Sequence, residues 1–533
     1  MRQNDAGRKA EMFDTVIKNV RIIDGSGTPW YRGDIGIQGG RIRKIGCITQ
    51  EEGNIVDGGD LYAAPGFIDI HSHSDTTLME YPQAESRILQ GITTEIGGNC
   101  GLSTAPVSHD PAKKEMLRAY VGDLSYEWNT VGEFLDQVEQ VPISVNFGTE
   151  VGHGSIRIAA MGFENRKPDE AEMETMRHLL RESLEGGAFA MSSGLIYPPG
   201  CYADTEELIE LCKELAPYHA FYATHMRGEG ENVVESVKEA IAICERSGAP
   251  LEISHHKVVK KSVWQVHCKT TIALIDQARR NGLDVKADQY PYRASSTTLD
   301  INLPAWAFEG GMEALFARIR DPKTREKMRR ESNASHLGRW GEIYVGYAES
   351  EKNQWTVGKS MTEIAERMGC DPAEAVMDLV LEEKGRIDEI DFGMCEEDIE
   401  YIMKQPYVMA GSDGKAVPLT YAGRPHPRFF GTFPRIIRHY CLDRKLFSLE
   451  TAIHKMTCLP ASRLNLQDRG LLREGMWADI VIFDADRIRD NPSYEKPAQA
   501  CDGIQRVYVN GVLTAENGKH TGATAGKVLR HTK

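Results

Sequence analysis

Short apolar runs separated by turn residues fill the first part of the chain. Residues 15–63 contain segments such as VIKNVRIIDG and DIGIQGGRIRKIG, which are broken by Gly and Asp. No long helical pattern interrupts them, so they predict a small antiparallel β-sheet. Strand-like runs of the same kind return from residue 466 onward, for example in ADIVIFDA.

Between residues 64 and 295 the pattern changes to β-like runs that alternate with amphipathic helical stretches. Residues 168–185, for example, repeat methionine and leucine at helical spacing. This alternation indicates βα units on a parallel sheet. Seven β-like runs occur here and YVMAGSD at 407–413 supplies an eighth, so the pattern predicts an α/β fold of the TIM (β/α)8 barrel type.

The same pattern divides the chain into three segments. Residues 12–63 and 466–533 carry short strands, and residues 64–465 carry the predicted barrel. Within the barrel, the charged stretch 297–346 is too long for an ordinary βα loop. We therefore predict a mostly helical insertion after the seventh strand.

Charge and cysteine content narrow the class of protein. The 533 residues carry a formal net charge of -15, and acidic and basic residues are mixed along the chain, which argues against nucleic acid and anionic membranes as partners. The 11 cysteines show no repeated spacing, which favours reduced thiols. The first residues lack the apolar core of a secretory signal, and no apolar run reaches the roughly 20 residues that span a bilayer. We expect a cytoplasmic protein that acts on a small molecule.

The strongest chemical signal is the segment GFIDIHSHSD at residues 66–75. His71 and His73 stand two residues apart at the end of an apolar strand, so their side chains point to the same side. Two imidazoles on one face can chelate a metal ion, although a packed histidine pair gives the same pattern.

Four further side chains with metal-binding chemistry stand at predicted strand ends. Cys100 lies in GGNCG, His225 ends AFYATH, His255 ends PLEISHH and Asp413 lies in AGSDG. Taken singly, each also fits a structural role as an inert buried thiol, a hydrogen-bonded histidine or a turn-forming aspartate. In a barrel, however, all strand ends open onto one mouth, and thiolate, imidazole and carboxylate together suit zinc.

These segments, together with PGFIDIHSH and the later GLLREGMWADIVIFD, resemble the D-aminoacylase (N-acyl-D-amino-acid deacylase) family of the amidohydrolase superfamily over nearly the whole chain. The resemblance implies a TIM barrel with a small β-sandwich domain built from both termini. It also implies one tightly bound zinc ion and a weaker second position. The expected ligands of the tight ion are Cys100, His225 and His255, and those of the weaker one are His71, His73, Cys100 and Asp413.

Two other functions share this superfamily fold. Hydantoinases and dihydroorotases, which hydrolyse cyclic amides, bridge two metals with a carbamylated lysine of strand four, but GAFAMSSGL contains no lysine. D-aminoacylases instead use a strand-two cysteine, which matches Cys100. A non-catalytic scaffold on the same barrel is the second alternative, and the presence of every expected ligand counts against it.

The resemblance also implies the reaction and its residues. Asp413 is expected to take the proton of the attacking water and pass it to the departing amine, which releases a carboxylate and a free D-amino acid. The substrate α-carboxylate is expected to meet Lys257, Tyr290, Ser296 and Arg424, with Tyr292 as a rival to Tyr290.

Other features of the substrate site remain open from the sequence. His153, in EVGHGSIR, matches a Gly-His of the family and is expected either to contact the substrate or to support its loop. An acidic substrate side chain would need a second cation, for which Arg227, Lys257 and Arg293 are candidates. The sequence predicts neither the acyl-group preference nor the oligomeric state.

Overall fold

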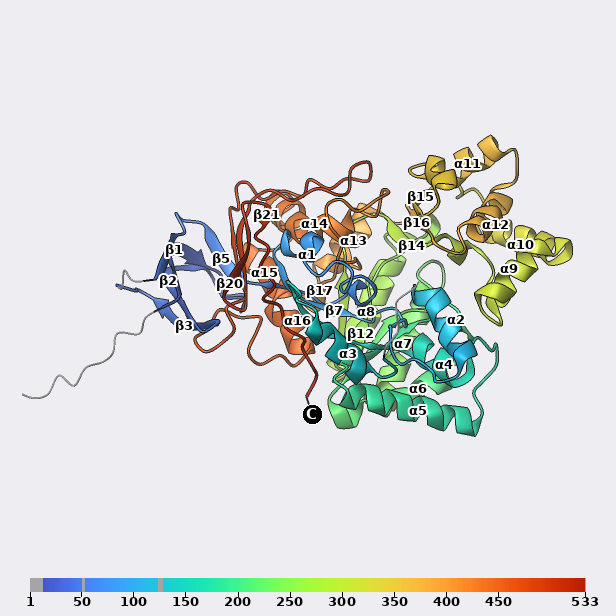
Figure 1. The fold of residues 1–533 in the computed structure, drawn as a ribbon, viewed down its shortest axis with the longest axis horizontal. Helices are drawn as coiled ribbons and strands as arrows, with labels where there is room; N and C mark the ends of the chain where they lie inside the picture. The colour runs from blue at the N-terminus through green and yellow to red at the C-terminus, as the bar shows by residue number, and fades with distance from the viewer. Residues whose placement is uncertain (1–12, 50–52, 123–127, 533) are drawn as a thin grey trace, which may run out of the picture.

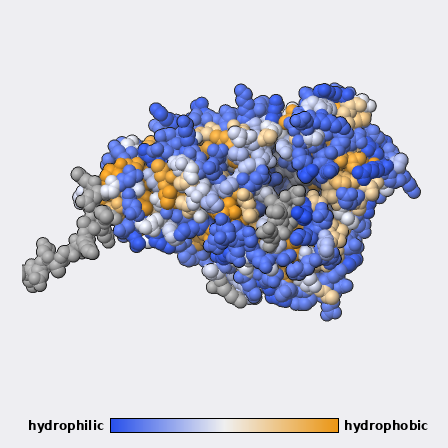
Figure 2. Space-filling model, in the orientation of Figure 1, coloured by the Kyte–Doolittle hydropathy of each residue, from blue (hydrophilic) through white to orange (hydrophobic). Residues whose placement is uncertain are grey.

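The computed structural model describes residues 13–49, 53–122 and 128–532 (Figure 1). The residues at the outer ends of the two predicted terminal segments, 12 and 533, lie outside the described residues, as does the N-terminal stretch considered as a possible secretory signal. Among the helices that the structure describes, none is long and apolar enough to cross a bilayer. The visible face of the surface is predominantly hydrophilic, with apolar patches toward the terminal sheet (Figure 2).

A nine-stranded sheet joins the two ends of the chain, in the order β21-β20-β19-β18-β5-β1-β2-β3 with β4 beside β1. Its N-terminal strands are β1 (Thr15–Ile22), β2 (Tyr31–Gln38), β3 (Arg41–Gly46), β4 (Asn54–Asp57) and β5 (Tyr62–Pro65). Its C-terminal strands are β18 (Ile480–Phe483), β19 (Ile504–Val509), β20 (Val512–Glu516) and β21 (Lys519–His520). β5 and β18 pair antiparallel, which holds residues more than 400 positions apart side by side.

Apolar side chains of both halves share one core in this sheet. Ile35 and Ile37 of β2 belong to the same buried cluster as Ile480 and Ile482 of β18, although two strands separate them in the sheet order. The backbone amide of Ile42 also donates to the carbonyl of Met476 at 2.9 Å, which ties β3 to the segment before β18.

The central part of the chain forms parallel strands that are almost entirely buried, as strands covered on both faces require. One sheet holds β6 (Phe67–Asp69), β7 (Ile92–Gly97) and β8 (Asn146–Thr149). Another holds β9 (Val151–Gly152), β10 (Ala190–Gly194), β11 (Phe221–His225), β12 (Leu251–Ile253), β13 (Val285–Gln289) and β17 (Val408–Ala410). Only one residue separates β8 from β9, so the chain passes directly from one sheet to the other.

Backbone hydrogen bonds also connect the first and last of these strands. The amide of Asp413, after β17, donates to the carbonyl of His71, after β6, at 2.8 Å. The amide of His73 donates to the carbonyl of Gly414 at 2.8 Å. The carboxyl ends of β6 and β17 are therefore neighbours.

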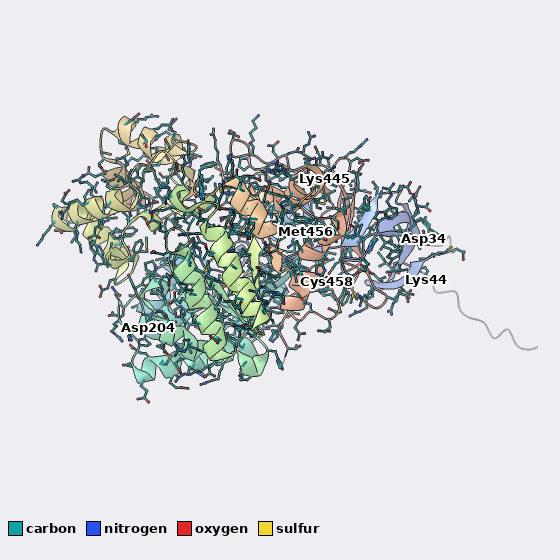
Figure 3. The ribbon with its side chains drawn as sticks, turned by 180° about the vertical axis from the view of Figure 1, so that it is seen from behind. Asp34, Lys44, Asp204, Lys445, Met456 and Cys458 are labelled. Carbon is teal, nitrogen blue, oxygen red and sulfur yellow. The ribbon has the colours of Figure 1, made fainter. Side chains whose placement is uncertain are left out.

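Helices follow most of the parallel strands. The helix predicted within 168–185 is confirmed as α5 (Glu170–Glu185), which begins with a capping box between Asp169 and Glu172. The side chain of Asp204, labelled in Figure 3, accepts from the amide of Glu207 and so caps α6. The helices of this part are α1 (Glu85–Ile88), α2 (Pro111–Val121), α3 (Val131–Gln140), α4 (His153–Met161), α5, α6 (Thr205–Cys212), α7 (Val233–Ser247), α8 (His267–Arg280), α13 (Glu396–Met403), α14 (Arg428–Arg435), α15 (Leu449–Met456) and α16 (Cys458–Arg463).

An insertion between β13 and β17 has its own sheet and its own apolar core. Its strands β14 (Ser295–Thr298), β15 (Ile343–Ala348) and β16 (Ile387–Asp391) pair antiparallel in the order β14-β16-β15. Its helices are α9 (Met312–Arg320), α10 (Pro322–Ser335), α11 (Met361–Met368) and α12 (Pro372–Glu382). The insertion and the terminal sheet, marked by Asp34 and Lys44, lie at opposite ends of the molecule (Figures 1 and 3).

Candidate metal centre and substrate pocket

Two groups of potential metal ligands meet at the carboxyl ends of the parallel strands. The first contains His71, His73, Cys100 and Asp413, and the second contains Cys100, His225 and His255. Within each group the ligand atoms lie within 4.8 Å of one another. The Cys100 sulfur is common to both and lies 3.4 Å from His71 Nε2 and 3.3 Å from His255 Nε2.

The backbone is unusual at three of these six residues. Cys100, His255 and Asp413 have φ angles of 54°, 35° and 51°, in the left-handed region that side chains other than glycine rarely adopt. All three directly follow or closely follow a strand of the parallel sheets. Conformations of this kind persist where the surroundings hold a side chain in one required direction, and here that direction is toward the other ligands.

Neighbouring charges favour the anionic forms of the thiol and the carboxyl. Burial opposes the thiolate of Cys100, but the His255 and His71 imidazoles outweigh it and hold the pKa of the thiol well below its usual range. Burial likewise opposes ionisation of Asp413, yet the Arg428 guanidinium and the hydrogen bond from His73 lower the pKa of that carboxyl.

The pKa values of two of the histidines shift upward. Despite burial, a hydrogen bond with Asp413 raises the pKa of His73 to about 9, and the Glu229 charge raises that of His225 to about 9. A divalent cation at these ligands would replace the protons that the imidazoles otherwise hold. The donor set, a thiolate with imidazoles and one carboxylate, fits zinc.

Two buried carboxylates fix the imidazoles from behind. Asp288 lies with Oδ2 3.1 Å from His71 Nδ1, and its Oδ1 accepts from the His255 amide at 3.0 Å. Glu229 places Oε2 3.4 Å from His225 Nε2 and Oε1 3.2 Å from His255 Nδ1. Such partners set the orientation of metal-binding histidines.

The sequence reasoning missed both carboxylates. Glu229 lies in MRGEGE just after β11, and Asp288 is within β13. Their position at or near strand ends was the available signal.

A cavity of about 360 Å³ opens above these ligands. His73, Cys100, His225, His255 and Asp413 line one part of it, and residues of β14, β16 and the segments that follow β14 line another. A volume of this size suits a small molecule.

Comparison with known proteins agrees with this geometry. The model of the "Amidohydrolase family" matches residues 54–515. The D-aminoacylase of Alcaligenes xylosoxydans xylosoxydans is 35% identical over 539 residues, which cover 100% of both chains. The N-acyl-D-glutamate deacylase of the same organism is 35% identical over 94% of this chain and 93% of its own.

The chain belongs to the D-aminoacylase family of amidohydrolases.

Solved structures of family members superpose over nearly the whole chain. N-acyl-D-glutamate deacylase from Bordetella bronchiseptica, solved with zinc and a phosphonate inhibitor, is 32% identical with a TM-score of 0.82 and covers 98% of this chain and 100% of its own. A crystal structure of D-aminoacylase is 34% identical with a TM-score of 0.81 and covers 97% and 100%. These similarities establish the α/β amidohydrolase fold.

The structure does not bring Arg424 to the pocket. Arg424 is exposed, its amide donates to the carbonyl of Gly346 at 2.8 Å, and its guanidinium packs against Gly358. The physical reason is that the chain turns into the interior directly after Arg424, since Pro425, His426 and Pro427 are buried ahead of α14, which begins at Arg428.

Arg428, four residues further along and not named by the sequence reasoning, is the arginine of this segment that the structure places in the pocket. It lines the pocket and is 3% exposed. Its Nη1 lies 2.8 Å from Asp413 Oδ2, and its Nη2 donates to the carbonyl of Ser296 at 2.9 Å. Among the described residues, Nε has no hydrogen-bond acceptor, so this buried guanidinium keeps an N–H group for a ligand.

The other residues predicted to bind the substrate do not all line the pocket. Lys257 and Ser296 line the pocket. Tyr290 is buried with a hydroxyl that has no hydrogen-bond partner among the described residues, and its ring lies 4.8 Å from the Arg428 guanidinium carbon. Its rival Tyr292 instead donates to the carbonyl of Pro427 at 3.4 Å.

His153 does not line the pocket. It is fully buried and its Nε2 lies 2.8 Å from Glu207 Oε1, beside the ion pair that Glu207 makes with Arg157. This arrangement ties α4 to α6 and leaves His153 in a supporting position.

Proposed function

We propose that this chain is a zinc-dependent deacylase that hydrolyses the amide bond of N-acyl-D-amino acids, giving a carboxylate and a free D-amino acid. The observation that carries the proposal is the position of Cys100, whose sulfur belongs to both groups of metal ligands. The relatives named D-aminoacylase and N-acyl-D-glutamate deacylase support the substrate class.

Cys100, His225 and His255 would hold the tight zinc ion, and His71, His73, Cys100 and Asp413 a weaker second position. Zinc bound there supplies a Lewis acid that polarises the amide carbonyl and lowers the pKa of water to about 7. A D-aminoacylase structure of the same family is described in terms of activation by one metal and attenuation by a second, which supports unequal roles for the two positions.

Asp413 acts as the proton carrier. Arg428 and His73 keep its carboxyl ionised, so it is ready to accept the proton of the attacking water. The same carboxyl then donates that proton to the departing amine. The ion pair with Arg428 couples this residue to the end of the substrate that Arg428 binds.

Arg428 binds the substrate α-carboxylate, with Lys257, Ser296 and Tyr290 around it. A guanidinium offers N–H donors in a planar fork that matches a carboxylate, and the buried Nε of Arg428 has no acceptor among the described residues. Arg424 has no part in it. His153 supports α4 instead of contacting the substrate.

The parallel strands close as a TIM barrel of eight strands, in which β8 and β9 together form the third, and the nine-stranded sheet forms a small β-sandwich domain from both termini. The backbone hydrogen bonds between the ends of β6 and β17 support closure of the barrel. The core shared by β2 and β18 supports the small domain.

The alternative function as a cyclic amidase is disfavoured by β10, whose sequence AMSSG has no lysine to bridge two metals. The test is a panel of N-acetyl-D- and N-acetyl-L-amino acids assayed for released amine, with hydantoin and dihydroorotate as competing substrates. Strong preference for the D-enantiomers is expected. Equal hydrolysis of both enantiomers, or turnover of the cyclic amides alone, would overturn the proposal.

Zinc content after dialysis separates the enzyme from a non-catalytic scaffold. We expect close to one tightly held zinc ion per chain. A chain that holds no zinc and releases no amine would be a scaffold.

A further inference from the structure

One wall of the pocket belongs to the insertion and carries an excess of carboxylates. Its acidic members are Asp300, Asp388, Glu389 and Asp391. Among the pocket residues that the insertion contributes, the structure describes no lysine or arginine, and the one histidine is His336. Burial lowers the pKa of His336, which keeps that imidazole neutral.

Three of the four carboxylates already have partners. Asp391 pairs with Arg339 at 2.5 Å, Glu389 accepts from the amide of Asn302, and Asp300 accepts from the hydroxyl of Thr298 at 2.5 Å. These contacts stabilise the three carboxyl groups within the pocket wall without any ligand.

Asp388 differs from them. It is half-buried on β16, opposite Thr298 of β14, and its carboxylate makes no hydrogen bond or ion pair of 4.0 Å or less with any described residue. The charges that act on it are those of Lys415 and Arg428, and they only partly offset the cost of its burial. A partly desolvated carboxylate without a counter-ion is unfavourable, so a positively charged group placed beside Asp388 would stabilise it.

An acidic substrate side chain would require a cation in the pocket, and two of the candidate cations already pair with carboxylates of the protein. Arg227 pairs with Glu239 at 3.0 Å and Lys257 pairs with Glu229 at 2.6 Å. Arg293 is exposed and does not line the pocket. Lys415 is the remaining lysine of the pocket without a close acidic partner among the described residues, and it acts on Asp388 from the barrel side.

The buried Nε of Arg428, which has no acceptor among the described residues, points independently to a ligand in this pocket. With the α-carboxylate at Arg428 and the amide at the metal ligands, the side chain of the substrate remains to be accommodated. The insertion wall is the part of the pocket that these two contacts leave free.

We propose that this subsite receives a cationic side chain, so that the preferred substrates are N-acyl derivatives of D-lysine, D-ornithine or D-arginine, with Asp388 as the counter-ion. The proposal rests on the proposed deacylase function. An ammonium or guanidinium group supplies the missing partner of Asp388 through a charge-assisted hydrogen bond. A carboxylate side chain would instead add a like charge beside Asp388, Asp300 and Glu389.

The experiment compares kcat/KM for matched substrates. N-acetyl-D-lysine is measured against N-acetyl-D-norleucine, and N-acetyl-D-arginine against N-acetyl-D-citrulline, with N-acetyl-D-glutamate as the acidic member. We expect the wild-type enzyme to prefer each cationic substrate over its neutral counterpart at least tenfold. This first comparison needs no variant, and a cationic-to-neutral ratio near one, or a preference for the glutamate derivative, would overturn the proposal.

Asp388→Asn should lower the cationic-to-neutral ratio by about ten- to a hundredfold, the loss expected for one hydrogen bond to a charged group. The matched control is Asp378→Asn, which removes the same charge from the insertion but outside the pocket, where Asp378 pairs with Arg325 at 2.8 Å. The control should leave the ratio unchanged. An unchanged ratio in Asp388→Asn would assign the preference to another residue and overturn the role of Asp388.

Failure of this proposal is distinct from failure of the proposed function. If neutral or acidic N-acetyl-D-amino acids are hydrolysed best, the deacylase function stands and the cationic subsite is wrong. If none of the five derivatives releases amine, the proposed function itself is wrong. A preference for N-acetyl-D-glutamate that disappears in Lys415→Met would assign the subsite to Lys415.

Discussion

The two arginines of the segment RPHPR provide a sharp test of the site, because the sequence favours one and the structure favours the other. We predict that Arg428→Met lowers kcat/KM for N-acetyl-D-amino acids by about 10- to 150-fold, mainly through KM. This range follows from the loss of one hydrogen bond to a charged group, about 1.5 to 3 kcal/mol, at about 1.4 kcal/mol for each factor of ten. Arg424→Met removes the same charge from an exposed side chain and should change kcat/KM less than twofold.

A second effect distinguishes Arg428 from a residue that only binds substrate. Arg428 is the largest influence that lowers the pKa of Asp413, so its removal should raise that pKa. A carboxyl with a raised pKa becomes protonated at a higher pH, and kcat should therefore fall earlier as the pH is lowered. Arg428→Lys keeps the positive charge and should restore much of the pH profile, while KM stays high because an ammonium group lacks the planar pair of donors.

The assay is steady-state release of amine from one N-acetyl-D-amino acid between pH 5 and 9, with zinc content measured on each preparation. Equal zinc content in all variants excludes loss of the metal as the cause. If Arg424→Met carries the loss of kcat/KM and Arg428→Met behaves like the wild type, the assignment made from the structure is refuted.

Four other substitutions test the metal centre and its support. Cys100→Ala should lose both the tight zinc ion and turnover; full zinc content with ordinary rates would make Cys100 a core thiol. Asp413→Asn should keep the tight zinc but lower kcat by about 10²- to 10⁴-fold, and a drop below tenfold would exclude it as the proton carrier. Glu229→Gln should weaken zinc binding about 10- to 100-fold in a chelator competition, and unchanged affinity would contradict its orienting role. Arg87 forms a fully buried ion pair with Asp69 at 3.0 Å, beside His71; Arg87→Met removes that counter-ion and should cost about 3 to 5 kcal/mol of unfolding free energy in urea denaturation, whereas a cost below 1 kcal/mol would contradict the importance of the pair.

The sequence was sufficient to gather the six candidate metal ligands because their position depends on a local rule. Each one ends or follows a strand that is recognisable from its apolar residues, and parallel strands place their carboxyl ends at one edge of the sheet. The two groups of ligand atoms within 4.8 Å are the outcome of that rule. At least one helix was equally accessible, since α5 (Glu170–Glu185) lies within the segment 168–185 whose methionine and leucine spacing predicts a helix.

The choice between Arg424 and Arg428 depended on information that no local rule contains. Both lie in the short segment RPHPR, both follow Asp413, and both fit a carboxylate equally well. What separates them is the residue at which the chain enters the interior, and this is set by the packing of α14 and by the contact of Arg428 with Ser296. Helix α14 also contains Pro434, a residue that argues against a helix in a sequence pattern.

The pocket wall that we propose faces the substrate side chain was even harder to predict from the sequence. It arises from the pairing of β14 with β16, two strands that lie roughly 90 residues apart in the chain. The segment IDEID holds three acidic residues among its five, a composition typical of a surface segment, and gives no sign that Asp388 borders a pocket. Only the register, which places Asp388 opposite Thr298, brings its carboxylate to the space left by the metal ligands and Arg428. The chemistry of the reaction therefore depends on strand ends that a short segment specifies, whereas the preference for a side chain depends on long-range pairing in the insertion. We therefore expect that a change in β16 can alter substrate choice without moving any residue of the metal centre. Comparing two variants tests this separation directly. Asp388→Asn should alter the ratio of cationic to neutral substrates, and Cys100→Ala should alter the zinc content.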